Sequence, residues 1–170
     1  DLGGATRTIT VNGNKATIDG VISNGGLTKA GSVELQLGAA NTYTGATVLE
    51  TGTLSLSGSG RLSDSTAVTV EGGTLDFNAI SDTVGSFAIT GGTFRDGTLT
   101  AATYNLGGGT IDATGALGAG TLTNTANTTL NGTAAATTID VTGGTLTLGS
   151  ASRFNGTTPA LTVSSGANLA

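Results

Sequence analysis

The stretch Asn41–Leu56, NTYTGATVLETGTLSL, predicts the architecture of the whole chain. It begins with turn-forming residues, continues into the β-branched run Ala46–Leu49 and, after a break at Glu50–Gly52, ends in the alternating segment Thr53–Leu56. Alternation of polar and apolar residues is typical of a strand with one buried face. A strand-and-turn unit that returns at a nearly fixed spacing indicates a repeat protein. The closing unit, Gly-Thr followed by an apolar residue, recurs at Gly73, Gly92, Gly109 and Gly144.

Apolar residues at matching points of the repeat fall into three columns, with a mean spacing of about 18 residues that suits a solenoid coil. Three apolar positions per period, separated by Gly, Asn or Ser turns, predict three short strands per coil and about nine coils. We therefore expect residues 1–170 to form one all-β segment, a β-solenoid of the parallel β-helix type. The columns are Leu54, Leu75, Phe94, Ile111, Leu130, Leu146 and Leu161 for the first, Val70, Ile89, Leu106, Leu122 and Val141 for the second, and Leu62, Ile80, Leu99 and Leu117 for the third.

The composition excludes several classes of function. The chain has no cysteine and no histidine, so a Ser-His-Asp or Cys-His mechanism and a zinc site built from those ligands are ruled out. Its net charge is −5, and its six Lys and Arg residues are scattered, whereas a nucleic-acid surface needs clustered cations. No apolar run approaches the length of a membrane-spanning helix. We expect no catalytic residue, no cofactor and no metal ion.

Over about residues 19–57 the sequence resembles a known family. The segments Gly20–Ser23, Gly26–Gly31, Leu35–Val48 and Gly52–Leu54 follow one another in the order of the autotransporter-associated β-strand repeat, also called the passenger-associated transport repeat. This repeat occurs in passenger domains of type V secreted proteins of Gram-negative bacteria. The matching positions are Leu27, Lys29, Gly31, Asn41, Thr42, Tyr43, Thr44, Gly45, Gly52, Thr53 and Leu54.

The resemblance implies a right-handed parallel β-helix stalk at the bacterial cell surface or in the secreted fraction. It implies export through the inner membrane and then through an outer-membrane β-barrel that is covalently continuous with the passenger. It also implies that the repeat promotes secretion and folding. Because uncapped coils expose strand edges, we expect a longer parent protein and possible end-to-end self-association. Host or matrix glycans are expected partners of such a parent, which would then act as an adhesin.

One alternative is a carbohydrate-active enzyme, since parallel β-helices also carry enzymes of that kind. Such a site needs clustered carboxylates, or carboxylates with Lys or Arg, in one groove. The alternation places Asp76, Arg95 and Asp112 on the outer face as a ladder of alternating charge, which we interpret as a solvated surface pairing. Asp96 falls at an inward position, as a bulge or a buried acid. These four residues are the best candidate cluster.

A second alternative is a repetitive binding surface. The uneven spacing of the first column argues against a flat lattice, although the Thr-x-Thr pairs resemble the threonine arrays of ice-binding solenoids. An adhesive or self-associating surface module is a further alternative. We expect Tyr43 and Tyr104 to pack in strands or corners and not to serve as ligand platforms. The Thr-x-Thr pairs begin at Thr8, Thr51, Thr98, Thr121 and Thr145.

Overall fold

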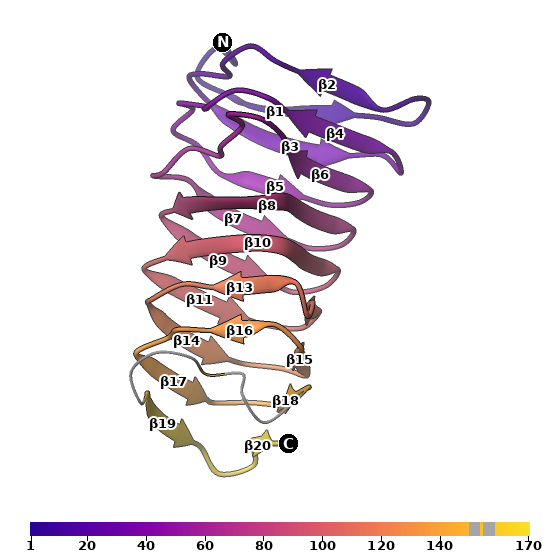
Figure 1. The fold of residues 1–170 in the computed structure, drawn as a ribbon. Helices are drawn as coiled ribbons and strands as arrows, with labels where there is room; N and C mark the ends of the chain where they lie inside the picture. Colours follow the sequence, from indigo (N-terminus) through magenta and orange to yellow (C-terminus); the bar gives the residue numbers. More distant parts are fainter. Residues whose placement is uncertain (150–153, 155–158) are drawn as a thin grey trace.

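The computed structural model describes residues 1–149, 154 and 159–170. All the regular secondary structure in this part of the chain consists of β-strands (Figure 1). The strands wind into a β-solenoid of about eight turns with about 19 residues per turn, close to the nine coils of 18 residues expected. The predicted all-β fold of parallel strands is therefore confirmed, and the right-handed winding stays a prediction. Within the described residues no helix is long and apolar enough to cross a membrane.

The strands form two parallel sheets that run along the stack. The nine-strand sheet consists of β1 (Thr6–Thr10), β3 (Gly26–Ala30), β5 (Thr47–Leu49), β7 (Ala67–Val70), β9 (Ser86–Ile89), β11 (Thr103–Leu106), β14 (Thr121–Asn124), β17 (Thr138–Val141) and β19 (Ala160–Val163). The eleven-strand sheet consists of β2 (Ala16–Ile18), β4 (Glu34–Leu37), β6 (Thr53–Leu56), β8 (Thr74–Val84), β10 (Thr93–Ala101), β12 (Thr110–Ile111), β15 (Thr128–Leu130), β18 (Thr145–Leu148) and β20 (Asn168–Leu169), with β13 (Gly115–Leu117) and β16 (Thr133–Ala134) off this path.

The third strand of the predicted coil is regular only in the middle of the stack. There β8 and β10 are long and bend, so that their second halves pair with each other and continue into β13 and β16. The bend of β8 lies at Asn78 and Ala79, which have positive φ, and that of β10 lies at Asp96, where the register shifts. In the earlier turns the third face is reduced to isolated bridges, between Ser23 and Thr42 and between Ala40 and Arg61.

The alternation of buried and solvent-facing side chains along the strands explains how a chain with a modest share of apolar residues builds a core. In β9, β11, β14 and β17 every second residue is buried, because successive side chains of a strand point to opposite faces. At the centre of the stack three aromatic rings meet edge to face: Phe94 lies 5.1 Å from Phe77 and 5.9 Å from Phe87 between ring centroids. Each turn therefore buries its apolar residues against the turns on either side.

The register differs from the predicted columns at several positions, mostly by two residues. In the second column Asn124, not Leu122, lies beside Leu106 and Val141. In the third column Asp82, not Ile80, lies beside Leu99.

The first column is correct as far as Leu130 and wrong after it. There Leu148, not Leu146, lies beside Leu130, while Leu161 belongs to the other sheet and pairs with Ile139. A shift of two residues keeps every side chain on its face, so the apolar pattern alone does not distinguish the two registers.

Candidate functional site

The residues that resemble the transport repeat, over the segment 19–57 (the repeat segment), lie mainly inside the solenoid. Leu27, Lys29, Tyr43 and Leu54 are all fully buried. Their partners are in neighbouring turns: Leu27 pairs with positions in β1 and β5, and Leu54 lies between Leu35 and Leu75. Within the same motif the side chains of Thr42 and Thr44 face solvent, and Thr53 is half-buried. Most of the motif therefore serves packing between turns.

The side chain of Asn41 connects three consecutive turns. Its Oδ1 accepts a hydrogen bond from the backbone N–H of Ile22 in the preceding turn, at 2.9 Å. Its Nδ2 donates to the carbonyl of Ala39 in its own turn, at 3.1 Å, and to that of Arg61 in the following turn, at 2.6 Å. Asn41 is only 6% exposed, so these bonds satisfy backbone groups in a corner where water is largely excluded.

Lys29 is a buried cation that binds carbonyl groups. Its Nζ donates to the carbonyls of Ala30 and Gly31 at 2.8 Å and to the carbonyl of Thr51, in the next turn, at 3.1 Å. The ion pairs found among the described residues do not include it. Burial lowers the pKa of Lys29 below its usual value because the charged form loses hydration. Lys29 thus joins the corners of two turns at a cost in desolvation.

Asn124, like Lys29, is a buried side chain that donates hydrogen bonds to carbonyl groups at the corners of two turns, but it lies outside the repeat segment. Both lie in one inward row of the nine-strand sheet, Lys29 one residue before the end of β3 and Asn124 at the end of β14. The Nδ2 of Asn124 donates to the carbonyls of Ala126 and Gly143, at 2.8 and 2.9 Å. Its Oδ1 has no hydrogen-bond partner within the described residues. Polar links between corners therefore occur outside the repeat segment too.

Tyr43 begins a chain of hydroxyl groups inside the stack. Its Oη lies 2.6 Å from Oγ1 of Thr47, which lies 3.3 Å from Oγ1 of Thr66 in the next turn. Thr66 in turn donates to the carbonyl of Gly45 at 2.7 Å. Burial raises the pKa of Tyr43 to about 12. Tyr43 is fully buried and Tyr104 is 1% exposed, so both pack inside the stack as predicted.

All three motif glycines exclude a side chain at their positions, as Gly45 and Gly52 illustrate. The N–H of Gly45 donates to the carbonyl of Gly25 at 2.6 Å, and a β-carbon on Gly45 would lie 2.8 Å from that oxygen. Gly52 has a φ of +72°, and its β-carbon would meet the carbonyl of Gly31 at 2.3 Å. Glycine is required where turns approach this closely or where φ is positive.

The four residues of the predicted charged cluster line one hollow of about 410 Å³, here called the Arg95 hollow, together with Asn78 and Thr114. Arg95 binds the buried carboxylate of Asp76 through Nε at 2.8 Å and through a terminal nitrogen at 2.6 Å. Asp112 follows Arg95 in the register, as the predicted ladder requires, because Phe94 pairs with Ile111. The ion pair of Arg95 in the described part of the chain is with Asp76, and Asp112 accepts hydrogen bonds from the backbone and hydroxyl of Thr114. Asp96 occupies the bulge and is half-buried.

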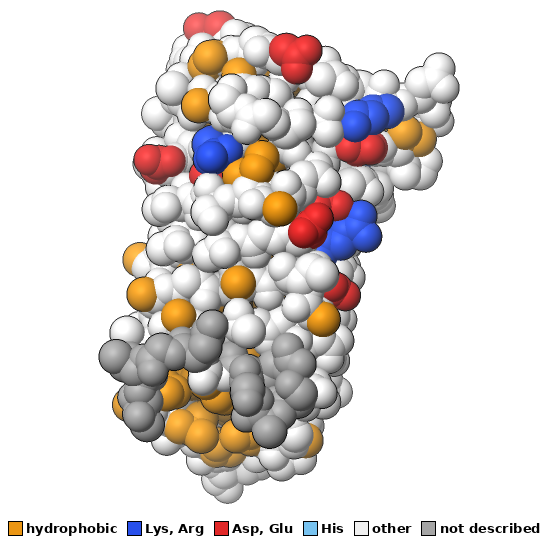
Figure 2. Space-filling model, in the orientation of Figure 1, with side chains coloured by type: hydrophobic (Ala, Val, Ile, Leu, Met, Phe, Trp, Pro, Cys, Tyr) orange, Lys and Arg blue, Asp and Glu red, His pale blue; other side chains and the backbone are white. Residues whose placement is uncertain are grey.

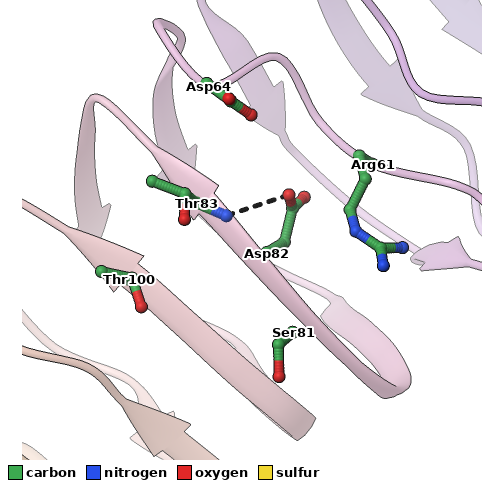
Figure 3. Close-up of a pocket in the computed structure, with 6 residues that line it drawn as sticks. All are labelled: Arg61, Asp64, Ser81, Asp82, Thr83 and Thr100. Atoms are coloured by element: carbon green, nitrogen blue, oxygen red, sulfur yellow. Dashed lines mark hydrogen bonds between the residues drawn. The ribbon is translucent and has the colours of Figure 1, made fainter.

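A second hollow was not predicted. Arg61, Asp64, Ser81, Asp82, Thr83 and Thr100 line a space of about 240 Å³. The Asp82 carboxylate points between Asp64 and Arg61 (Figure 3). It accepts hydrogen bonds from the backbone N–H of Leu62 at 2.7 Å and of Thr83 at 2.9 Å.

Asp82 is 5% exposed, and burial raises the pKa of its carboxyl to about 6. The signal in the sequence that could have identified this hollow was the position of Asp82, an acidic residue in a column of inward-facing residues. The two-residue register error hid that signal, because it placed Ile80 in the position that Asp82 occupies.

The charged side chains are unevenly distributed along the stack. After Asp112 the chain carries charge only at Asp140 and Arg153. Figure 2 accordingly shows the charged side chains on its visible face gathered over the N-terminal turns. No group of three or more acidic residues arranged to hold a metal ion occurs within residues 1–149, 154 and 159–170.

Comparison of the chain with protein-family models, with curated proteins and with solved structures gives no match.

Proposed function

We propose that the chain is a non-catalytic β-solenoid stalk of a type V secreted, autotransporter-like surface protein of a Gram-negative bacterium, in which residues 19–57 promote folding and secretion. The passenger would be anchored through an outer-membrane β-barrel continuous with it and would stand at the cell surface. The observation that carries the proposal is Asn41, a residue of the repeat motif whose buried side chain bonds to three successive turns.

The physical rationale is sequential stacking. A turn of a solenoid buries its apolar face only against a neighbouring turn, so folding advances by adding turns to those already formed. Side chains that bond to the preceding and the following turn raise the free energy needed to remove a turn once it is added. Outside a pore, stacked turns of this kind would oppose backward movement of the chain.

The experiment is a secretion assay on the parent passenger with Asn41→Ala, scored by intact protein outside the cell. We expect a marked loss of secreted protein, comparable to that on deletion of residues 19–57. Thr42→Ala, at the adjacent exposed position, should secrete normally.

Asn124→Ala is the control for general destabilisation, because Nδ2 of this buried asparagine also donates to a carbonyl of its own turn and to one of the following turn, outside the repeat segment. Normal secretion of Asn41→Ala would leave residues 19–57 as a passive spacer. An equal loss with Asn124→Ala would assign the effect to general stability and overturn the special role of the repeat.

A further inference from the structure

A polar groove runs along the third face of the solenoid across four successive turns. The hollow around Asp82 shares Arg61 and Asp64 with an adjoining hollow of about 380 Å³ that reaches Thr42. The lining residues therefore come from the turns of Thr42, Arg61, Asp82 and Thr100. With neighbouring parallel strands about 4.8 Å apart, the groove is about 15 Å long. It is called the Asp82 groove below.

The groove offers donors, acceptors and hydroxyl groups side by side. Each oxygen of the Asp82 carboxylate accepts one backbone hydrogen bond, which fixes the group and leaves further lone pairs for a ligand. The Arg61 guanidinium donates one bond, to the carbonyl of Gly60 at 2.6 Å, and belongs to neither ion pair found in the described part of the chain. Its remaining N–H groups are available as donors.

The hydroxyl groups extend this surface into the next turn. Thr83 and Thr100 are register partners on adjacent strands, and both line the hollow. A surface that presents a fixed acceptor, a forked donor and hydroxyl groups complements a ligand whose own groups both donate and accept.

The same chemistry excludes other ligands. Two carboxylates disfavour a polyanion, while the Arg61 guanidinium and the lack of a cluster of metal-ligating side chains among the described residues disfavour a metal ion. The hollow around Asp82 has no aliphatic or aromatic lining residue, and the adjoining hollow adds only Ala40 and Leu62, so a peptide anchored by large apolar side chains has no pocket.

We infer that the Asp82 groove binds a neutral oligosaccharide, with Arg61 donating to sugar oxygens, Asp82 accepting from sugar hydroxyls, and Thr83 and Thr100 adding hydroxyl contacts. The site differs from the Arg95 hollow, in which the cation is already paired with Asp76. It does not depend on the secretion role, because binding is a property of the folded chain.

The test is a titration of the ¹⁵N-labelled chain with cellotetraose and maltotetraose, which are neutral, and with trigalacturonic acid, which is anionic. We expect saturable shifts confined to residues 40–42, 60–65, 81–83 and 100, with a Kd of about 1 mM for a neutral probe in so open a site. Arg61→Gln should weaken binding by at least about tenfold. Thr83→Val, an exposed change that serves if Arg61→Gln does not fold, should weaken it several-fold.

Arg95→Gln is the control, since it changes an arginine in the other hollow, and it should bind as the unaltered chain does. The inference is overturned by the absence of saturable shifts with both neutral probes, by shifts located around Arg95 and Asp112, or by tighter binding of trigalacturonic acid. Equal weakening by Arg61→Gln and Arg95→Gln would also overturn it, because it would indicate nonspecific attraction.

Discussion

At the scale of single residues, the buried polar groups of this solenoid act on the backbone of neighbouring turns. Asn41, Lys29 and Asn124 each donate to carbonyl groups of more than one turn, and Asp82 accepts from the N–H of Leu62 in the turn before it. Corners of a solenoid contain backbone groups outside the regular ladder, and leaving such a group unpaired when buried costs about 1–3 kcal/mol. These four buried polar residues therefore satisfy backbone groups at the corners.

Asp82 should make stability depend on pH in the direction opposite to that of most acids. The folded carboxyl has a pKa of about 6, against an ordinary value of 3.8. The folded chain therefore holds this proton more tightly than the unfolded chain does. Its contribution to stability is fully present below pH 3.8 and is lost as the pH rises through about 6.

Asp82→Asn should remove that dependence. The difference in the free energy of unfolding between the variant and the unaltered chain should change by about 2 kcal/mol between acidic and neutral pH. This is less than the full pKa shift of Asp82 implies, because water reaches the groove. Urea unfolding across this range measures it, and Ser81→Ala, exposed and non-titrating on the same strand, should give a flat difference curve. A flat curve for Asp82→Asn would show that Asp82 does not titrate in this range.

At the scale of strands and turns, the spacing between coils is set by glycines as well as by side-chain packing. At Gly45 the backbone of one turn touches that of the turn before it, at Gly25 and Gly26. A methyl group there has no space and would push two turns apart along the whole corner. Gly13 has nothing within 4 Å of an added β-carbon.

Gly45→Ala should therefore lower the free energy of unfolding by about 2 kcal/mol. Gly13→Ala should leave stability unchanged or raise it slightly, because it only restricts the unfolded chain. Urea denaturation of both variants measures the difference. Equal stability of the two variants would contradict this expectation, because it would mean that the backbone at Gly45 can shift to admit a methyl group at no cost in the free energy of unfolding.

The same scale shows what the sequence could and could not predict. Alternation identified the strands and their inner faces, and the Gly-Thr-apolar unit placed Leu54, Leu75 and Phe94 in register, which brought Asp76 and Arg95 together correctly. The alternation did not distinguish residues two apart on one face. The prediction therefore placed Leu122 in the column where the structure has Asn124. Hydrophobicity favours the apolar choice at each such position, and a polar residue that satisfies a corner is the case in which that choice fails.

At the scale of the whole molecule, each turn contacts only its neighbours, so stability is close to a sum of local terms. Two long parallel sheets hold the stack in register, and the middle turns have the additional third strand formed by β8, β10, β13 and β16. The centre is further reinforced by the aromatic contacts of Phe94. A substitution at the centre should therefore change the stability of different turns from those affected by a substitution in an end turn.

Phe94→Ala should cost about 3–5 kcal/mol and should speed amide hydrogen exchange most in β8, β10 and β12, with smaller effects in distant turns. Leu169→Ala, in the last described strand, should raise exchange only in β18, β19 and β20. Hydrogen exchange followed by mass spectrometry measures both patterns. A uniform rise over all turns in either variant would show that the solenoid opens as one unit, contrary to a sum of local terms.

The stacking of turns also determines how the chain would respond to mechanical force. A pull applied along the stack loads the hydrogen bonds between one turn and the next, so the outermost turn peels away while the turns beneath it stay intact. Each event frees about 19 residues, or about 60 Å of extended chain. A turn tied by Asn41 to both neighbours requires more force to detach. We expect such a stack to lengthen in steps under tension and to shorten again as turns are restored.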